Sequence, residues 1–459
     1  MSTRELPEGW TETTIEDISV KCAQRVPRDN EEFIYIDIGS IDRELKRIDS
    51  PQHINGENAP SRARKSLKTG DVLVSLTRPN LNAVALVDGK YDGQIASTGF
   101  EVIRPIMIES RYIFSTVRSR HFIESITGAV QGALYPAAKS SDVQSYMIAL
   151  PPLAEQKIIA DKLDGLLARV ESIKTRLENI PEILKKFRQS VLSAAVSGRL
   201  NSKHCPMKSI HVGYGWPHDV EGPSHWVEYK LSDIIKIVGG SQPPKSDFRD
   251  VCVDGYIRLI QIRDYKSDNH KVFIPRDKAK RFVYKDDVMI GRYGPPIFQI
   301  LRGLEGAYNV ALMKAVPNEE VIRNDYLYWY LQNFNIFNYV ESGSDRTAGQ
   351  SGVNKKHLES YPMLIPSLTE QDEIIKSLEI FFSYVKSIEL KAIDALNKVN
   401  NLTQSILAKA FRGELTAQWR EENFELISGL NSAEALLEKI TAEKLAAGTV
   451  KKRAKKTSH

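Results

Sequence analysis

The chain contains two copies of one long segment, and this internal repeat constrains the fold more than any other feature. The first copy spans residues 150–200 and the second spans residues 365–415. They align without a gap, because Ile159 matches Ile374 and Gly198 matches Gly413, at an offset of 215 residues in both cases. This period is far too long for a solenoid, whose units repeat every ~20–50 residues. The repeat predicts two copies of one plan, each an irregular block followed by a long helix.

Apolar residues recur in alternating steps of four and three along both copies, a spacing typical of coiled-coil helices. Proline precedes each predicted helix and glycine ends it. The matching registers predict that the two stripes pack on each other; two unrelated amphipathic helices in one core are the alternative. Pro181 predicts a kink in the first helix, or two stacked helices. The stripe positions are Ile159, Leu163, Leu166, Val170, Ile173, Leu177, Ile180, Leu184, Phe187 and Val191, and then Ile374, Leu378, Phe381, Val385, Ile388, Ala392, Ala395, Val399, Leu402 and Ile406.

The blocks that precede the two helices match only at a few points. LPEGW at Leu6–Trp10 parallels GPSHW at Gly222–Trp226, and GDVLV at Gly70–Val74 resembles DDVMI at Asp286–Ile290. Two recognition modules for different targets would look like this, and so would simple drift after duplication. Short apolar runs bounded by Gly, Pro, Asp and Asn predict an α+β fold for each block. Strands are expected at Phe33–Ile38, Val72–Leu76, Tyr256–Ile262 and Val283–Ile290, and helices at Ser110–Ile126 and Asp325–Tyr339.

Composition sets only wide bounds on function. The 459 residues carry a formal net charge of +5, which permits nucleic-acid binding without indicating it. The three cysteines have no CxxC spacing, so we expect reduced thiols and no zinc site. The sequence has no signal peptide and no long apolar run, and we expect a soluble, cytoplasmic protein.

The last stretch of the chain reads separately from the two repeats. Ser432–Gly448 predicts a short amphipathic helix with a serine start and a glycine stop. The basic run KKRAKK at Lys451–Lys456 follows. Such a tail either contacts DNA phosphate or is simply solvated.

The sequence lacks the common catalytic signatures. It contains no GxxxxGK[ST] motif for ATP and no HExxH motif for zinc. DNA adenine methyltransferases have Asp, Asn or Ser directly before a proline pair and an aromatic residue directly after it, and neither YGPPIF at Tyr293–Phe298 nor SQPPK at Ser241–Lys245 has this pattern. We therefore expect no catalytic residue on this chain.

Basic and amide side chains gather in loops of both blocks and are the candidate DNA-binding residues. Arg and Lys suit phosphate and guanine, whereas Asn and Gln suit adenine. For any single residue a solvated surface position is the favoured interpretation, whereas for the clusters that recur in both blocks the two interpretations are about equal. The candidates are Arg62, Arg64, Lys65, Lys68, Arg78, Asn80, Gln131 and Lys139 in the first block, and Lys278, Lys280, Arg281, Arg292, Tyr293, Arg346, Gln350, Lys355 and Lys356 in the second.

The two helix starts, PPLAEQ at Pro151–Gln156 and PSLTEQ at Pro366–Gln371, resemble those of type I restriction–modification specificity subunits. The segment Asn400–Arg420 resembles the enterobacterial type IA subgroup. The resemblance covers essentially the whole chain, but it is weak within the blocks. Ser367 stands where the first copy has Pro152.

This resemblance implies an α+β fold in which two target recognition domains alternate with two long helices, paired as an antiparallel coiled coil. Each domain would read one half of a bipartite, asymmetric site in double-stranded DNA, and the helices would fix the spacer. The expected parts are 1–149 and 222–364 as recognition domains, 150–200 and 365–420 as helices, 201–221 as a linker and 421–459 as a C-terminal helix and basic tail.

The resemblance also implies partners. Two modification subunits would dock on the helices, with Glu155, Gln156, Glu370 and Gln371 as the expected docking residues, and would carry S-adenosylmethionine and adenine methylation. Restriction subunits would add ATP- and Mg-dependent cleavage, so no cofactor or metal is expected on this chain. A fused enzyme with a hidden active site and a structural coiled-coil adaptor without DNA readout are the alternatives.

Overall fold

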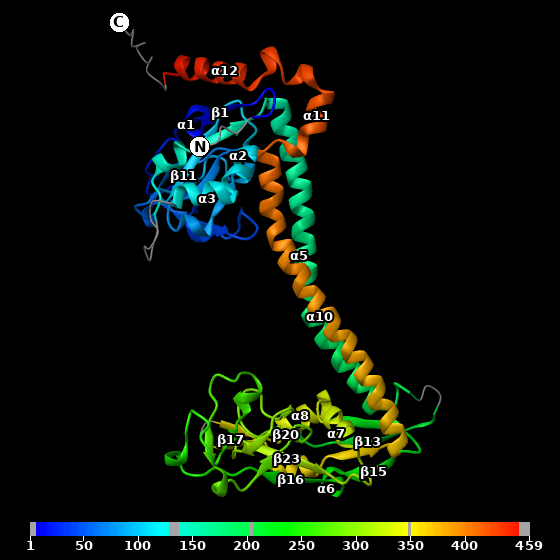
Figure 1. Cartoon of the computed structure of the whole chain (residues 1–459). Helices are drawn as coiled ribbons and strands as arrows, with labels where there is room; N and C mark the ends of the chain where they lie inside the picture. The colour runs from blue at the N-terminus through cyan, green and yellow to red at the C-terminus, as the bar shows by residue number, and fades with distance from the viewer. Residues whose placement is uncertain (1–5, 128–136, 202–204, 348–349, 449–459) are drawn as a thin grey trace. The chain divides into compact units, whose positions relative to one another are not determined.

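The computed structural model describes residues 6–127, 137–201, 205–347 and 350–448. The chain divides into two compact units. Unit 1 comprises Met1–Leu177 and Ala395–His459, and unit 2 comprises Glu178–Asp394. The long helices α5 (Leu153–Val196) and α10 (Leu368–Phe411), labelled in Figure 1, each contribute residues to both units.

The two blocks share one sheet topology, although their sequences hardly match. In unit 1 the four-stranded sheets have the orders β2-β11-β8-β9 and β6-β3-β10-β7, and in unit 2 the orders are β16-β23-β20-β21 and β18-β17-β22-β19. The only parallel pair in these described sheets occurs at the same place in both units, β3 with β10 and β17 with β22. Shared strand order and direction identify the blocks as two copies of one domain.

The strands of unit 1 are β2 (Ser19–Val20), β3 (Glu32–Ile36), β6 (Gln52–Asn55), β7 (Ala63–Ser66), β8 (Val72–Ser75), β9 (Val84–Leu86), β10 (Ile95–Ser97) and β11 (Phe100–Pro105). Those of unit 2 are β16 (Ile235–Gly239), β17 (Tyr256–Ile260), β18 (Phe273–Pro275), β19 (Phe282–Val283), β20 (Val288–Gly291), β21 (Gln299–Leu301), β22 (Gly306–Tyr308) and β23 (Leu312–Pro317). The predicted run Val283–Ile290 was wrong as one strand, because a turn at Tyr284–Asp287 divides it into β19 and β20.

The central strand of each domain is buried on both of its faces. Val72 and Val74 of β8 pack into one core cluster, and Leu73, which points the opposite way, packs into another. In unit 2, Val288 and Met289 of β20 likewise pack into two different core clusters. Burial on both faces explains why GDVLV and DDVMI are continuous apolar runs and not alternating ones.

A short antiparallel ladder joins the start of each domain to the start of its long helix. β1 (Thr11–Thr14) pairs with β12 (Met147–Leu150), and β15 (Val227–Lys230) pairs with β26 (Pro362–Ile365). The first and last strands of each domain therefore pair with each other immediately before the long helix begins.

The helical stretches expected before these ladders are confirmed, and each consists of two helices. Ser119 Oγ accepts from Phe122 N in unit 1, and Asn333 caps a new helix in unit 2, so a cap interrupts each run. The helices are α2 (Ser110–Val117), α3 (Arg120–Thr127) and α4 (Ser140–Gln144), and then α7 (Asn324–Tyr330), α8 (Phe334–Ser342) and α9 (Lys355–Glu359).

The long helices have equal lengths of 44 residues. The alternative of two stacked helices was wrong, because α5 continues through Pro181. The predicted glycine stops are confirmed, since Gly198 and Gly413 adopt left-handed φ values of 70° and 74°. A Cβ at Gly198 would lie 2.4 Å from Pro223, and one at Gly413 would lie 2.6 Å from Pro7.

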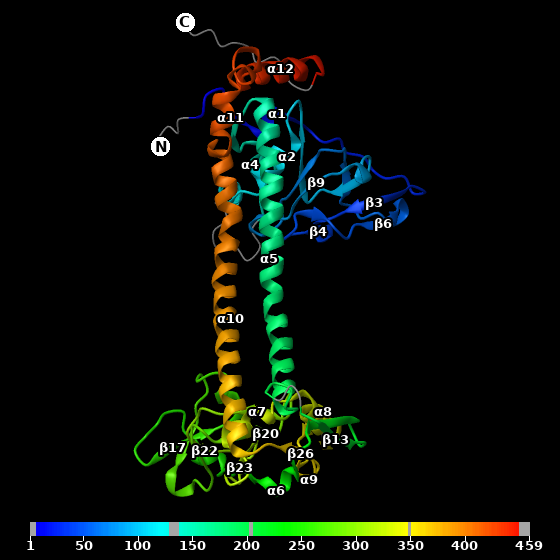
Figure 2. The same cartoon turned by 90° about the vertical axis from the view of Figure 1, so that its right-hand side faces the viewer.

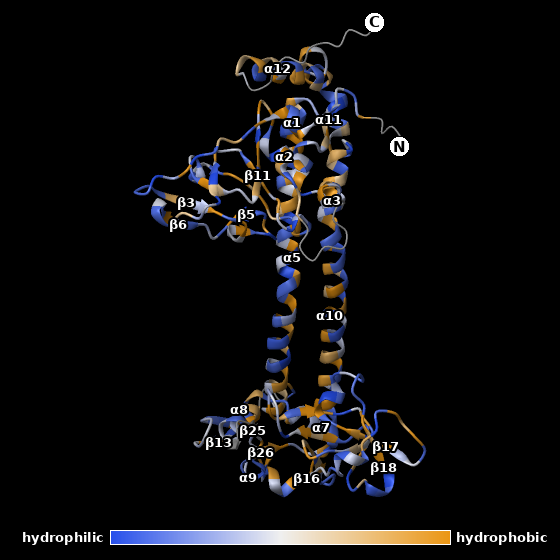
Figure 3. Ribbon diagram, turned by 90° about the vertical axis from the view of Figure 1, so that its left-hand side faces the viewer, coloured by the Kyte–Doolittle hydropathy of each residue, from blue (hydrophilic) through white to orange (hydrophobic). Residues whose placement is uncertain are grey.

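Figure 3 shows apolar residues recurring along both helices. Near the helix ends these residues are buried, whereas along the middle parts buried positions such as Val385 alternate with exposed ones. Ile159 and Leu163 are fully buried, whereas Ile173 and Ile388 expose 45% and 47% of their surface. The ends of the helices therefore belong to the domain cores, and the middle parts offer apolar surface to solvent.

The predicted C-terminal helix is confirmed as α12 (Ala433–Ala446), with Ser432 Oγ accepting from Ala435 N. It follows the short helix α11 (Ala417–Glu422) and packs Leu436 and Ile440 into the core of unit 1. Lys444 Nζ donates to the carbonyl of Glu16 (2.6 Å) in α1 (Ile15–Ile18), and Figure 2 shows α12 next to α1. The basic run 451–456 lies outside the described residues. None of the described helices has the length and hydropathy to span a membrane.

A buried carboxylate holds the junction between helix and domain in unit 1. Glu155, which has no exposed surface, accepts from Trp10 Nε1 (2.7 Å), Thr416 Oγ1 (2.6 Å) and Arg420 Nη1 (2.6 Å). These donors come from the first strand region of the domain and from the segment that follows α10. One carboxylate thus connects three parts of the chain that are distant in sequence.

The matching junction of unit 2 is built on Glu370. Its carboxylate accepts from Trp226 Nε1 (3.0 Å) and contacts His225 Nε2 (3.1 Å). The side chain of Glu370 keeps 16% of its surface exposed. The tryptophan and the glutamate therefore recur with the repeat, but the buried arginine is specific to unit 1.

We expect Glu155→Ala to lower the free energy of unfolding of unit 1 by about 3–5 kcal/mol, since it leaves the Arg420 charge, the Trp10 indole N–H and the Thr416 hydroxyl without their acceptor. The matched change Glu370→Ala should cost only about 1 kcal/mol in unit 2, where water reaches the site. Urea titration followed by hydrogen exchange in each unit measures both values. Equal losses would contradict the structural role assigned to the buried carboxylate.

Candidate nucleic-acid interface

The loop after the central strand is held in the same way in both domains. In unit 1, Thr77 forms an isolated antiparallel bridge with Ala137, and in unit 2, Tyr293 forms one with Gly352. Each bridge connects the loop to the segment that precedes α4 in unit 1 or α9 in unit 2. The backbone frame of this loop pair is therefore common to both domains.

The unit 1 loop owes its shape to two left-handed residues. Arg78 and Asn82 have φ values of 49° and 47° and flank a 3-10 turn at Pro79–Leu81. The buried Asn82 amide donates to the carbonyl of Val117 (2.9 Å) and anchors one end of the loop. Arg78 and Asn80 extend from the exposed part of this loop. An arginine and an asparagine held on an anchored turn can present donors and acceptors to a base edge.

The unit 2 loop is anchored by apolar side chains instead. Ile297 and Phe298 are buried in the large core of unit 2, and Arg292 N donates to the carbonyl of Ala311 (2.8 Å). The Arg292 guanidinium lies 5.0 Å from the centre of the Tyr293 ring, in cation–π geometry. This loop therefore presents a stacked arginine–tyrosine pair where unit 1 presents Arg78.

The remaining candidates are spread over the domain surfaces and do not form one cluster. Arg62 and Lys68 are exposed at the two ends of β7. Lys65 lies 3.8 Å from Glu101 with only 14% of its side chain exposed, and Arg64 donates to the carbonyl of Ala63. Ion pairing reduces the charge that Lys65 can offer to a phosphate.

In unit 2, Lys280 and Arg281 are exposed beside β19, whereas Lys278 forms an ion pair with Asp247 (2.7 Å). Lys355 Nζ donates to the carbonyl of Ile237 (3.0 Å). Lys356, like Lys139 in unit 1, is exposed. Gln131 lies outside the described residues, as do the side chains of Arg346 and Gln350 on the hairpin β24 (Asp345–Thr347) and β25 (Gln350–Gly352).

The structure gives the expected docking residues an internal role. Gln156, which is fully buried, donates to the carbonyl of Pro151 (2.8 Å) and accepts from Glu109 N (3.0 Å), the residue that caps α2. Gln371 repeats this arrangement with Pro366 and Arg323. With Glu155 also buried, contact of these three side chains with a partner stays a prediction that requires the junctions to open.

Lys46 and Arg118, which were not among the residues predicted from the sequence, lie beside the unit 1 loop. Lys46 Nζ donates to the carbonyl of Asn82 (2.7 Å), beside a cavity of about 610 Å³ that is also lined by Asn80 and Arg118. Burial, together with the positive charge of Arg118, lowers the pKa of Lys46 to about 8. No local motif marks Lys46, because the contact depends on how two distant loops meet.

Among the described residues, no group of His, Cys, Asp and Glu side chains has an arrangement suited to hold a metal ion. The three cysteines are free thiols.

Comparison with known proteins identifies a family for both copies. Residues 7–182 and 223–400 each match the type I restriction modification DNA specificity domain. The chain is 40% identical over 356 residues to the type I restriction enzyme EcoBI specificity subunit of Escherichia coli, which covers 73% of this chain and 72% of that protein. It is 32% identical to the EcoKI specificity subunit of Escherichia coli strain K12, with both proteins covered in full.

Solved structures agree with this assignment. The crystal structure of the HsdS subunit from Thermoanaerobacter tengcongensis matches with a TM-score of 0.65 and 26% identity, covering 90% of this chain and 99% of that one. A chain from a structure describing complex assembly and conformational transition of the type I R-M system matches with a TM-score of 0.68 and 25% identity, covering 89% and 99%.

Removing the two exposed charges at the ends of β7 should weaken DNA binding and its salt dependence. We expect the double variant Arg62→Gln/Lys68→Gln to flatten the slope of log K against log salt by about 1.8, since each lost phosphate contact contributes about 0.9. Lys65→Gln is the matched control and should leave the slope nearly unchanged. Fluorescence anisotropy at several salt concentrations measures the slopes. An unaltered slope in the double variant would remove these residues from the interface.

The low pKa of Lys46 predicts a pH-dependent stability. Because the folded-state pKa of about 8 lies below the ordinary value of 10.5, the unfolded chain binds more protons between these pH values, and stability rises with pH there. Lys46→Met lacks this contribution. The Tm of the native chain relative to that of the variant should therefore increase from pH 7.5 to pH 10 in thermal unfolding. A constant difference would show that Lys46 titrates normally.

Proposed function

This chain belongs to the family of type I restriction–modification specificity subunits, and from that premise we propose that each of its two recognition domains reads one half of a bipartite, asymmetric DNA site. The observation that carries the proposal is the bridged loop pair. Both domains hold it on the same backbone frame, yet one presents Arg78 and Asn80 and the other presents Arg292 and Tyr293. A constant frame with different side chains suits two modules that read different bases.

The two long helices act in this proposal as an antiparallel coiled-coil spacer. In unit 1, Lys162 near the start of α5 donates to the carbonyl of Leu415, just beyond α10 (2.8 Å). In unit 2, Phe187 near the end of α5 packs edge-on against Phe381 near the start of α10, with ring centres 6.4 Å apart. Contacts between the start of one helix and the end of the other, in both units, support antiparallel pairing.

The helices also limit the distance between the two half-sites. A helix of 44 residues is about 66 Å long at about 1.5 Å per residue. At about 3.4 Å per base pair, this length corresponds to an upper limit of about 19 base pairs. The spacer in the DNA would thus be fixed by helix length, independently of the bases that the loops read.

The chemistry of modification and cleavage would reside on other proteins. Two modification subunits would dock along the helices and bring S-adenosylmethionine for adenine methylation, and restriction subunits would bring ATP- and Mg-dependent cleavage. The exposed apolar residues in the middle part of the helices, such as Ile173 and Ile388, are surface of the kind that partner helices cover. This chain would supply no catalytic group and would act in the cytoplasm.

Exchange of one domain tests this proposal against the adaptor alternative. Residues 6–149 are replaced with the equivalent domain of a relative that reads a different half-site, and the complex with modification subunits methylates a DNA library. We expect one half of the methylated motif to change while the other half and the gap are retained. A structural adaptor would leave the whole motif unchanged, and that result would contradict DNA readout by this domain. The reciprocal exchange of residues 207–364, which keeps the hairpin of β13 (Met207–Val212) and β14 (His218–Pro223) with its domain, is the matched control.

A further inference from the structure

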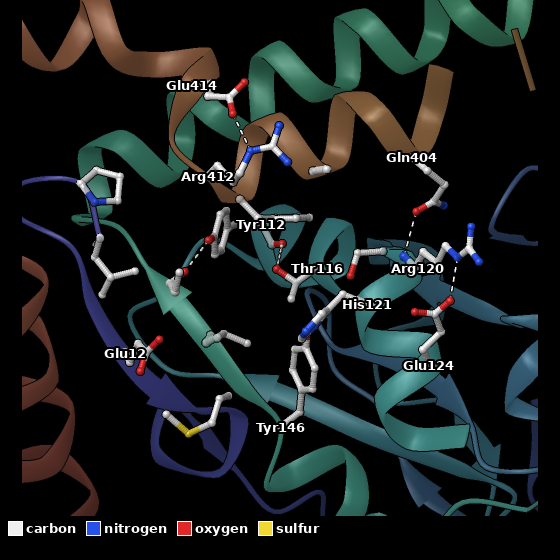
Figure 4. A pocket seen from close by; sticks show the side chains of 18 residues that line it. Glu12, Tyr112, Thr116, Arg120, His121, Glu124, Tyr146, Gln404, Arg412 and Glu414 are labelled. Atoms are coloured by element: carbon white, nitrogen blue, oxygen red, sulfur yellow. Dashed lines mark hydrogen bonds and ion pairs between the residues drawn. The ribbon is translucent and has the colours of Figure 1, made fainter. Parts of the chain in front are cut away.

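A large open cavity lies within unit 1, apart from the candidate DNA-reading loops. Its volume is about 750 Å³, and Figure 4 shows it between the end of α10, the helices α2 and α3, and the strand β12. Met147, Ile148 and Ala149 of β12 form one wall, and Ala408 and Phe411 of α10 form the opposite wall. Met147 exposes 51% of its surface here. Apolar side chains thus line both walls; Met147 remains accessible, whereas Ile148 is buried.

Both arginines at the rim of this cavity are paired with carboxylates, and Glu12 adds one more carboxylate to the lining. Arg120 Nε forms an ion pair with Glu124 (2.6 Å), and Arg412 forms one with Glu414. His121 Nδ1 is hydrogen-bonded to the Tyr146 hydroxyl (2.7 Å). Since neither arginine is left over for a phosphate, an apolar ligand fits this cavity better than a nucleic-acid backbone does.

Because the chain contains an internal repeat, unit 2 contains a position that corresponds to this cavity. A smaller cavity of about 410 Å³ is lined there by Gln189, Ser193, Ser197 and Arg199 of the α5 end. At the repeat offset of 215, these residues match Gln404, Ala408, Arg412 and Glu414 of the unit 1 cavity. The strand β26, which corresponds to β12, does not line the cavity in unit 2.

The strand β26 is absent from that wall because a hairpin of the chain covers it. The hairpin comprises β13 (Met207–Val212) and β14 (His218–Pro223), and Figure 3 shows β13 close to β26. Its Val212 and Val220 are buried in the large core of unit 2, together with Leu364 of β26. Leu364 is fully buried, whereas its counterpart in unit 1, Ala149, is partly exposed.

Aromatic rings at the edge of the hairpin complete the cover. His218 stacks on Tyr361, with ring centres 5.8 Å apart, and Trp216 packs edge-on against Phe334 at 6.2 Å. Tyr361 matches Tyr146 at the offset of 215, and Phe334, the first residue of α8, corresponds to Arg120, the first residue of α3. The described residues of unit 1 contain no strand pair at the place of this hairpin.

We propose that the open cavity of unit 1 is a docking site for an extended apolar segment of a partner protein, which carries an aromatic side chain and takes the place that the hairpin β13–β14 takes in unit 2. The hairpin that covers the matching site in unit 2 indicates the chemistry of this ligand. The ligand would place alternating apolar side chains over β12 and an aromatic ring beside Tyr146. The inference rests on the proposed function in one respect, because the modification subunit is taken as the partner.

Photo-crosslinking in the assembled complex tests this proposal directly. Met147 is replaced with the photoreactive residue p-benzoylphenylalanine in the full chain, which is then bound to purified modification subunits, irradiated and analysed by mass spectrometry. We expect a crosslink to one segment of the modification subunit that contains an aromatic residue. The matched control places the same photoreactive residue at Pro362 of β26, where it should crosslink within the chain to residues 207–223.

Three results would overturn the proposal: a crosslink from position 147 to DNA, one to residues 1–5 of the same chain, or none while the control crosslinks. Methylation by the same preparation separates the two proposals. Site-specific methylation without the crosslink refutes only the docking site, whereas a complex that neither forms nor methylates refutes the proposed function and the docking site together.

A substitution provides a quantitative measure. Met147→Asp should weaken binding of the modification subunit roughly tenfold to a hundredfold, because it places a charge on the apolar wall. Val227→Asp is the matched control, since Val227 lies on the edge ladder of unit 2 with a similar exposure of 53%. The control should stay within about twofold of the native affinity. Equal affinities for both variants would contradict docking at this cavity.

Discussion

The fold depends most on the junction between each long helix and its domain, where a glutamate carboxylate accepts a hydrogen bond from the indole N–H of a tryptophan. In unit 1, Glu155 joins Trp10, the start of α5 and the segment after α10, and in unit 2, Glu370 joins Trp226 to the start of α10. A buried carboxylate is costly to desolvate, so it is retained only where several donors surround it. The glutamines that follow, Gln156 and Gln371, then bind the caps of α2 and α7. The short sequence EQ thereby fixes each long helix to its own domain.

The sequence predicted those features that local chemistry determines. The spacing of apolar residues predicted both long helices, and Gly198, Gly413 and Ser432 marked ends that the structure confirms. The sheet order could not be predicted, because strands such as β10 (Ile95–Ser97) pair with partners distant in sequence and are too short to have a clear period. Two stacked helices at Pro181 were a wrong expectation, since one lost hydrogen bond does not interrupt a helix of this length, whereas a kink there stays a prediction.

The candidate DNA interface was harder to predict than the fold. Charged residues in loops are common, and the sequence does not distinguish Arg62, which is exposed, from Lys65, which lies beside Glu101. The bridge of Thr77 to Ala137 and that of Tyr293 to Gly352 became visible only when distant segments were placed together. Lys46 and the cavity beside Met147 likewise result from tertiary packing. The internal repeat indicates which of these features matter, because a feature of one unit has a counterpart in the other.

In the proposed design, the loops on the shared frame would select the bases of each half-site, and the length of the helices would set the gap between the half-sites. The most direct test is a methylome. The chain is expressed with a cognate type IA modification subunit in a methylation-free host, and N6-methyladenine is mapped by single-molecule sequencing. The account predicts one bipartite motif with two different half-sites and a single fixed gap. An assembled complex that produces no new motif, or a motif with a variable gap, would contradict it.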